Sequence, residues 1–138
     1  MALHHNSDLK CPLCEEKLLN AHPLVADWFR RLKGKYINVH ISWSFRGQTD
    51  QDQFLKDGKT TLAWPKSKHN HMENGIPKSL ALDLFLIDED GIAKWPPLWF
   101  AQVNEENEQN QEPMLWAGTW KTFKETDHFE LITVKFPV

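Results

Sequence analysis

Hydrophobic and polar positions follow two different periods in the first third of the chain. Over residues 22–35 the apolar side chains recur at the spacing of one helix face, namely Leu24, Val25, Trp28, Phe29 and Leu32. Pro23 falls in the first turn and Gly34 near the end, so this pattern predicts an amphipathic helix. Over residues 36–45 apolar and polar residues alternate one by one, which predicts a half-buried strand.

Further short elements are predicted downstream. Thr49 is expected to cap a short helix that ends at Gly58, and a long polar connection follows over 59–78. Residues 79–88, SLALDLFLID, read as a second strand, and 92–95 as a short return strand.

The last third of the chain predicts one more helix and one more strand. The helix starts at the prolines in PPLWFAQV and is expected to direct these residues inward: Leu98, Trp99 and Val103. The alternating end of the chain predicts the final strand. The predicted helices and strands do not alternate as they do in βαβ units. This favours an α+β fold with a small, mainly antiparallel sheet flanked by helices. We expect a single domain over 21–138, after an irregular N-terminal extension, 1–20.

Composition and charge narrow the function classes. Seven Trp and eight Phe in 138 residues indicate a dense core or an open ligand groove. The formal net charge of −3 argues against nucleic-acid binding, which needs a basic face. No apolar run is long enough to insert in a membrane, and the start, MALHHNSDLK, lacks a secretory signal pattern. We therefore expect a protein that stays in the cytoplasm until something releases it. We also expect a monomer.

Two cysteines, Cys11 and Cys14, occur in the motif CPLC. Their spacing is typical of half a zinc site or of a redox pair. Histidines at positions 4, 5 and 22 are candidate partners for a small structural metal site. Catalytic redox use is disfavoured, because the motif precedes any strand instead of following one. An adaptor protein organised by CPLC would need a second ligand pair and a basic face, of which the sequence offers little.

Asp83 is placed inside an apolar strand, and burying an unpaired carboxylate is costly. One explanation is an ion pair with an arginine such as Arg46; the other is a metal ion. The histidines of SKHNH and the segment ETDHFE supply further ligand types. In ETDHFE, Glu125 and His128 are three residues apart, which on a helical turn would place both on one face. Each signal alone is weak. A lone histidine before a strand is more often a surface or capping residue, an aspartate in an apolar strand more often pairs with an arginine or lysine, and an ExxH triplet occurs by chance in many helices.

Four motifs in this order resemble the M15 family of zinc peptidases. They are FRxxxxQ, SKHN, PxSLALDL and GxWxxFxExxHFEL, and the resemblance runs from about residue 22 to residue 131. The family includes phage L-alanyl-D-glutamate endopeptidases, D-alanyl-D-alanine carboxypeptidases and D-alanyl-D-alanine dipeptidases. The resemblance implies the hedgehog/D-Ala-D-Ala peptidase-like fold and activity on peptidoglycan stem peptides.

Functional residues follow from the same resemblance. It implies three ligands for Zn2+, which are His69, Asp83 and His128. It also implies that Glu125 is the catalytic acid/base and that Arg46 steadies the oxyanion. In the same way Ser67 matches a substrate-binding serine, and Gln51 a glutamine of structural role. If exposed, these tryptophans would help form the groove: Trp43, Trp64, Trp116 and Trp120.

Two departures from the family pattern concern the predicted site. The gap between His69 and Asp83 is lengthened by the insert HMENGIPK, which leaves His71 as a rival ligand. Asp127 stands where the family has a proline before the last ligand, and it is expected to alter local geometry or charge. The leading hypothesis is a zinc peptidase of the endolysin type, from a phage, a prophage or a bacterium. The alternative is a zinc-binding module of the same fold that binds cell wall or a protein without cleaving.

Overall fold

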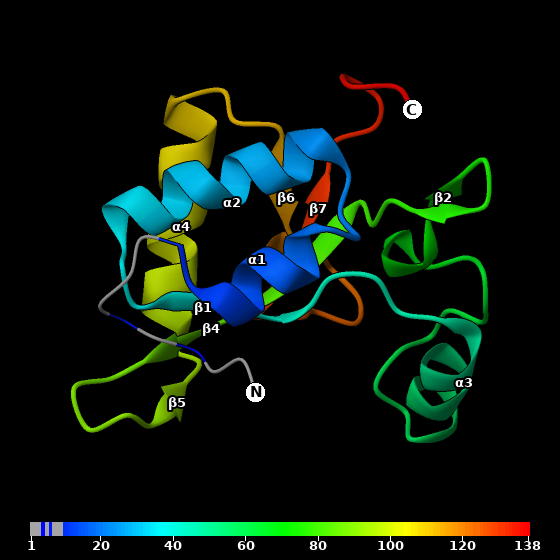
Figure 1. Ribbon diagram of the computed structural model, residues 1–138, viewed down its shortest axis with the longest axis horizontal. Coiled ribbons are helices and arrows are strands. Elements are labelled where there is room, and N and C mark those ends of the chain that lie inside the picture. The colour runs from blue at the N-terminus through cyan, green and yellow to red at the C-terminus, as the bar shows by residue number, and fades with distance from the viewer. Residues whose placement is uncertain (1–3, 5, 7–9) are drawn as a thin grey trace.

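The computed structural model describes residues 4, 6 and 10–138 (Figure 1). The four α-helices in this part of the chain are α1 (Pro12–Leu18), α2 (Pro23–Lys35), α3 (Gln48–Lys56) and α4 (Pro97–Gln109). The strands are β1 (Val39–Trp43), β2 (Met72–Glu73), β3 (Ile76–Pro77), β4 (Ala81–Ile87), β5 (Ala93–Lys94), β6 (Met114–Trp116) and β7 (His128–Leu131). Two short 3-10 helices, η1 (Lys68–Asn70) and η2 (Ala117–Thr119), complete the described elements.

An antiparallel sheet organises the molecule. Its strand order is β1-β4-β7-β6, and β5 pairs with the far end of β4. Strand β4 therefore lies in the interior, and its first six residues are all buried. The predicted α+β class, with a small antiparallel sheet and flanking helices, is confirmed. The predicted helix over 22–35 and the strands around His40 and Asp83 are confirmed as α2, β1 and β4.

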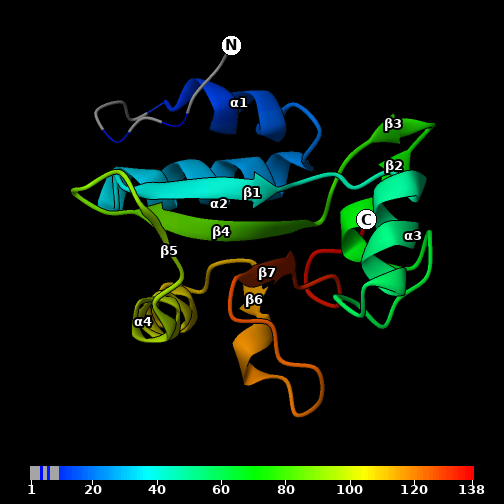
Figure 2. The ribbon, with the colours of Figure 1, turned by 90° about the horizontal axis from the view of Figure 1, so that it is seen from below.

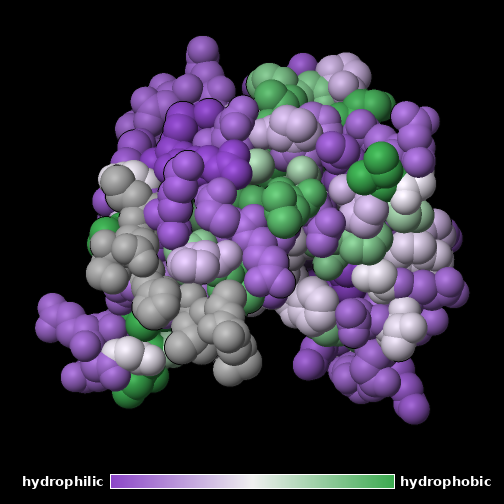
Figure 3. Space-filling model, viewed as in Figure 1, coloured by the Kyte–Doolittle hydropathy of each residue, from purple (hydrophilic) through white to green (hydrophobic). Residues whose placement is uncertain are grey.

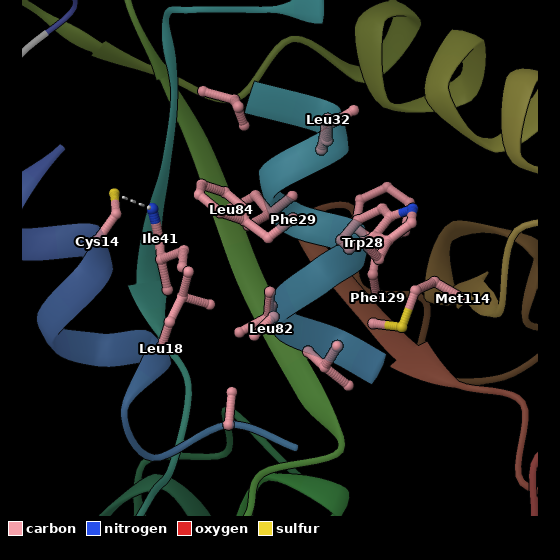
Figure 4. Packing of buried hydrophobic residues seen from close by; sticks show 14 of the residues in the cluster. Cys14, Leu18, Trp28, Phe29, Leu32, Ile41, Leu82, Leu84, Met114 and Phe129 are labelled. Carbon is pink, nitrogen blue, oxygen red and sulfur yellow. Dashed lines mark hydrogen bonds between the residues drawn. The ribbon is translucent and has the colours of Figure 1, made fainter. Parts of the chain in front are cut away.

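Helix α2 packs its apolar stripe on one face of the sheet (Figure 4). Trp28 and Phe29 are each 1% exposed, and the Trp28 ring lies 5.2 Å from that of Phe129 on β7. The Trp28 Nε1–H donates to Asn107 Oδ1 of α4 at 3.0 Å, which satisfies its buried polar atom. Helix α2 thus joins the sheet and α4 in one core.

Helix α1 covers the outer edge of β1 (Figure 2). The Ile41 N–H, which has no strand partner on that side, donates to Cys14 Sγ at 3.3 Å. Leu18 is buried in the same core cluster as α2. The prediction that residues 1–20 are irregular was wrong for 12–18, because Pro12 starts a helix and Leu18 is covered by the sheet. Covering the edge also removes a site for unwanted strand pairing.

Two smaller expectations were wrong, and one short strand was missed. The N-cap of α3 is Gly47, not Thr49. Leu98 is 86% exposed, because the buried stripe of α4 runs through Phe100, Val103 and Asn107 and Leu98 points elsewhere. Strand β6 was not predicted, since three residues are too few to show a period.

The molecular surface in Figure 3 is mostly hydrophilic, with hydrophobic residues in separate small groups. None of the helices in the described part of the chain has the length and apolar character needed to span a bilayer.

Candidate metal centre and cavity

Three side chains from different parts of the chain meet in a buried triangle. His69 Nε2 lies 3.2 Å from Asp83 Oδ1 and 3.2 Å from His128 Nδ1. The third side, from His128 Nδ1 to Asp83 Oδ1, measures 3.0 Å. All three residues are at most 7% exposed. The sequence-predicted ligand set is therefore brought together in one place.

Sheet register accounts for two corners of the triangle. Asp83 on β4 is paired directly with His128 on β7, and with Trp43 on β1. A register shift between Ile41 and Trp43 bends β1 beside Asp83, where Ser42 Oγ donates to the Asp83 carbonyl at 3.1 Å. Bulges of this kind often re-aim side chains next to functional sites. The expected helical turn at ETDHFE was wrong, because His128 begins a strand.

A short, rigid turn supplies the third corner. His69 lies in η1, and Ser67 Oγ accepts the His69 N–H at 3.2 Å while Asn70 Oδ1 accepts the Ser67 N–H at 3.1 Å. This capping box satisfies the backbone donors at the start of the turn. The His69 Nδ1 atom contacts the Ser44 carbonyl at 2.6 Å, which fixes the ring and directs Nε2 to the triangle. Ser67 lines the cavity, with its hydroxyl engaged in the cap.

His71 lies outside the triangle and contacts Glu73 Oε2 at 3.0 Å instead. The insert after it folds as the β2–β3 hairpin, so the longer gap does not displace Asp83. Asn74 and Gly75 at its tip both have positive φ, as two-residue hairpin turns of this kind require. His69 is thus the histidine of SKHNH that faces Asp83.

Glu125 lies on the rim of the triangle, with its Oε2 atom 3.4 Å from His128 Nδ1. Burial raises the pKa of the Glu125 carboxyl, against the opposing charge of His128. The pKa of the Asp127 carboxyl is also raised, to about 7, by burial and by the charge of Asp83. Its carbonyl accepts the Leu84 N–H at 2.9 Å, so the loss of the family proline leaves the backbone joined to β4. A carboxyl whose pKa is shifted toward neutrality suits proton transfer.

Arg46 lies against the other carboxylate oxygen of the triangle. Its Nη2 donates to Asp83 Oδ2 at 3.3 Å and its Nη1 to Gln51 Oε1 at 3.1 Å. The guanidinium carbon lies 3.9 Å from the centre of the Phe54 ring. Burial lowers the pKa of Arg46, against the charge of Asp83. The ion pair that the sequence offered as an explanation for Asp83 is present, together with the two histidines.

Burial disfavours the charged form of each residue in the triangle, and the neighbouring groups determine the direction in which each pKa shifts. For Asp83, the two histidines outweigh burial and hold its pKa well below the usual range. For His69, burial dominates and lowers the pKa. For His128, hydrogen bonds to Asp83 and Glu130 outweigh burial and raise the pKa to about 10. Asp83 is therefore ionised at neutral pH.

Glu130 is a site residue that the sequence reasoning missed. Its Oε1 atom lies 2.9 Å from His128 Nε2, and Lys68 pairs with its other oxygen at 2.7 Å. The signal was available, since residues two apart on a strand share a face. Glu130 orients the His128 ring so that Nδ1 faces the triangle, as carboxylates do behind metal-bound histidines.

The triangle fits a zinc ion. Two imidazole nitrogens and one carboxylate oxygen form a typical catalytic donor set, and tetrahedral bonds of about 2.0–2.1 Å separate ligands by about 3.3 Å. The three observed separations of 3.0–3.2 Å come close to this value. Both histidines also have their second nitrogen held by an acceptor, at Ser44 and Glu130.

A cavity of about 810 Å³ opens onto the triangle. Arg46 and Glu125 line it, and five lysines surround it: Lys59, Lys66, Lys68, Lys121 and Lys124. Of the four tryptophans considered for a groove, Trp120 lines the cavity. Trp43 packs on Phe54, Trp64 on Phe45, and Trp116 Nε1 donates to the Thr126 carbonyl at 2.7 Å.

The other candidate ligands lie apart from this cavity. Cys11 and Cys14 join His4 and His40 in a second cluster. The His22 ring accepts the Leu24 N–H at 3.2 Å and caps α2. The histidine at position 5 lies outside the described residues.

The fold and the His–Asp–His triangle together are those expected of an M15-type peptidase. No family model matches the chain. The chain is 28% identical over 122 residues to peptidoglycan L-alanyl-D-glutamate endopeptidase CwlK of Bacillus subtilis (strain 168), covering 80% of this chain and 73% of that protein. Its fold is similar to that of the L-Ala D-Glu endopeptidase ChiX of Serratia marcescens, with a TM-score of 0.70, 22% identity, and coverage of 91% of this chain and 90% of that one. The resemblance to the M15 peptidases is confirmed.

Proposed function

We propose that the protein is a zinc-dependent peptidoglycan peptidase that cleaves the bond between L-alanine and D-glutamate in stem peptides. The observation that carries this proposal is the triangle of His69, Asp83 and His128 with Glu125 beside it in an open cavity. CwlK and ChiX, the two similar proteins, are both named for this bond. A metal-binding module without catalysis would need no carboxylate at the position of Glu125.

The ligands that we assign to zinc are His69 Nε2, Asp83 Oδ1 and His128 Nδ1. When bound there, zinc would act as a Lewis acid on the scissile carbonyl and on a water molecule. The remaining steps are assigned to side chains. Glu125 accepts the proton of the attacking water and returns a proton to the leaving amine. Burial raises the pKa of Glu125, which makes its carboxylate a better acceptor for the proton of the water.

Arg46 is the residue that we assign to the negative charge that develops on the carbonyl oxygen. Gln51 and Asp83 hold its two terminal nitrogens. Its Nε atom is buried and has no hydrogen-bond partner within the described residues, so the donors offered to a substrate oxygen are the second N–H groups of the two terminal nitrogens. Donors fixed in advance and shielded from water stabilise such charge most strongly.

The lysines around the cavity support an acidic substrate. Lys59, Lys66, Lys121 and Lys124 are exposed at its edge, whereas the carboxylates of the site lie deeper. A glutamyl residue brings a carboxylate of its own to the scissile bond. The cationic edge would attract and orient that carboxylate. It would also attract the terminal carboxylate of D-Ala–D-Ala, so the choice of the L-Ala–D-Glu bond rests on the two similar proteins.

The deciding experiment is mass spectrometry of purified peptidoglycan after incubation with the zinc-loaded protein. We expect new C-terminal L-alanine on the muramyl side and new N-terminal D-glutamate on the released peptide. The Glu125→Gln variant, incubated in parallel, should release neither. Release of D-alanine alone would reassign the bond, and no new termini at all would contradict the proposal in favour of a binding module.

A further inference from the structure

A second cluster of ligand-type side chains lies between the start of α1 and β1. Cys11 and Cys14 come from the start of α1, His40 from β1, and His4 from the segment before α1. One ligand atom from each of the four lies within 4.8 Å of all the others. This cluster shares no residue with the cavity at Asp83.

The individual distances resemble those of a metal site. His4 Nδ1 lies 3.4 Å from Cys11 Sγ and 3.4 Å from Cys14 Sγ. His40 Nδ1 lies 3.6 Å from Cys14 Sγ. Tetrahedral zinc, with bonds of about 2.3 Å to sulfur and about 2.0–2.1 Å to nitrogen, separates these ligand types by about 3.6 Å.

The outer contacts of the cluster select the nitrogen that faces the sulfur atoms. His40 Nε2 contacts Asn6 Oδ1 at 2.7 Å, and Asn6 Nδ2 donates to the Ile87 carbonyl at 3.0 Å. An acceptor at Nε2 places the ring proton there and leaves Nδ1 with its lone pair toward Cys14. The same arrangement holds His69 at the first site, where Ser44 is the acceptor.

We propose a second, structural zinc site whose four ligands are His4, Cys11, Cys14 and His40. Two thiolates and two imidazoles are a typical closed donor set for zinc, with no position left for water or substrate. Cys11 and Cys14 are each 1% exposed and His40 is fully buried, as expected for a site that serves the fold. The ion joins the segment before α1, the start of α1 and the edge strand β1.

A redox role for the cysteine pair fits these observations less well. Reactive cysteines are partly exposed, since the partner thiol must reach the sulfur. Here both sulfur atoms are buried and face imidazole nitrogens, and Cys14 also accepts the Ile41 N–H. A redox pair needs neither histidine.

The site can be tested by counting metal in the full chain, purified under reducing conditions with zinc. We expect about two zinc ions per chain in the wild type and about one in the double variant Cys11→Ser, Cys14→Ser. The matched control is His22→Asn, which removes an imidazole but keeps a capping side chain, and should retain about two. Unchanged zinc in the cysteine variant would overturn the proposal.

Cobalt distinguishes the two sites even if the cysteine variant fails to fold. After replacement of zinc by Co2+, the wild type should show a thiolate-to-cobalt charge-transfer band in the near ultraviolet. Asp83→Asn, which removes a ligand of the other site, should keep this band, because that site contains no sulfur. A wild type without the band, or one whose mass under reducing conditions indicates a Cys11–Cys14 disulfide, would contradict the proposal whether or not the protein cleaves peptidoglycan.

Discussion

Asp83 and His128 face each other across β4 and β7, and their Oδ1 and Nδ1 atoms lie 3.0 Å apart. The pairing of two antiparallel strands thus fixes two of the three proposed ligands before any metal arrives. Sites on strands are held more tightly than sites on loops. Any change that shifts this register by one residue would turn one of the two side chains to the opposite face.

Replacing Asp83 should empty the proposed metal site. In Asp83→Asn the neutral amide is a poor zinc ligand, and Arg46 loses its charged partner. Zinc content, measured by mass spectrometry of the metal, should fall by about one ion per chain, and hydrolysis should be lost. Asp27→Asn changes an exposed carboxylate on α2 and serves as the control. Full retention of zinc in Asp83→Asn would refute the ligand assignment.

Glu125→Gln should separate binding from chemistry. The amide keeps the shape of the side chain but accepts no proton from water, so the rate should fall by about 10²–10⁴-fold. Zinc content should stay at the wild-type level, because Glu125 is outside the ligand triangle. Turnover of isolated peptidoglycan gives the rate, and an unchanged rate would rule out Glu125 as the general base.

Glu130→Gln should weaken zinc binding and leave the chemical step largely intact. Glu130 contacts the far nitrogen of His128 and carries no proton in the proposed reaction. Loss of such an outer carboxylate weakens metal affinity by about 10–100-fold. Titration with a competing chelator measures that affinity, and activity at saturating zinc should largely return. Activity that stays low at saturating zinc would indicate a direct role in the reaction.

Gln51→Met should destabilise the protein. The Gln51 side chain is fully buried, accepts from Arg46 and Asn70, and donates to the Leu62 carbonyl at 2.7 Å. Leaving such groups unsatisfied costs about 1–3 kcal/mol each, which urea unfolding can measure. Gln53→Met, on the exposed side of the same helix, should change stability little. Equal stability of the two variants would mean that the buried network contributes nothing.

Charge reversal at the cavity edge should weaken substrate binding. Lys66→Glu and Lys121→Glu each replace an attraction for an acidic stem peptide by a repulsion. An exposed pair is worth about 0.2–1 kcal/mol, so KM should rise about two- to fivefold per substitution, and less at high salt. Lys56→Glu on α3 changes the net charge equally but lies away from the cavity, and should leave KM unchanged. A KM that rises equally in all three variants would argue against specific recognition.

Much of the fold could be predicted because the hydrophobic residues of its main elements recur at regular spacings in the sequence. Helix α2 and strand β4 bury regular stripes of apolar residues, so their spacing identified them. The convergence of His69, Asp83 and His128 rested on family motifs, since no periodicity in the sequence indicates that residues 59 positions apart meet. Glu125 was placed near His128 for a partly wrong reason, because the segment is a turn before a strand and not a helical turn.

His40 was missed as a partner of the cysteines because strand alternation alone assigned it to a polar, solvent-facing side. In the structure the His40 side chain is buried, with the His4 ring 4.8 Å from it and Asn6 Oδ1 at 2.7 Å from its Nε2 atom. Alternation along β1 indicates two faces but does not tell what covers the second one. The role of His40 therefore depends on contacts with His4, Asn6 and Cys14 that no pattern in the sequence indicates.

The cavity is built partly from regular elements and partly from the connections between them. The triangle stands on sheet strands and a capped turn, whereas Lys59, Lys66 and Lys121 come from the connections before η1 and after η2. These connections contribute none of the three proposed ligands. The scaffold therefore separates metal binding from recognition: outside Glu125, which the second connection also carries, these connections can be exchanged, lengthened or recoded to accept another wall peptide while the three proposed ligands are left in place.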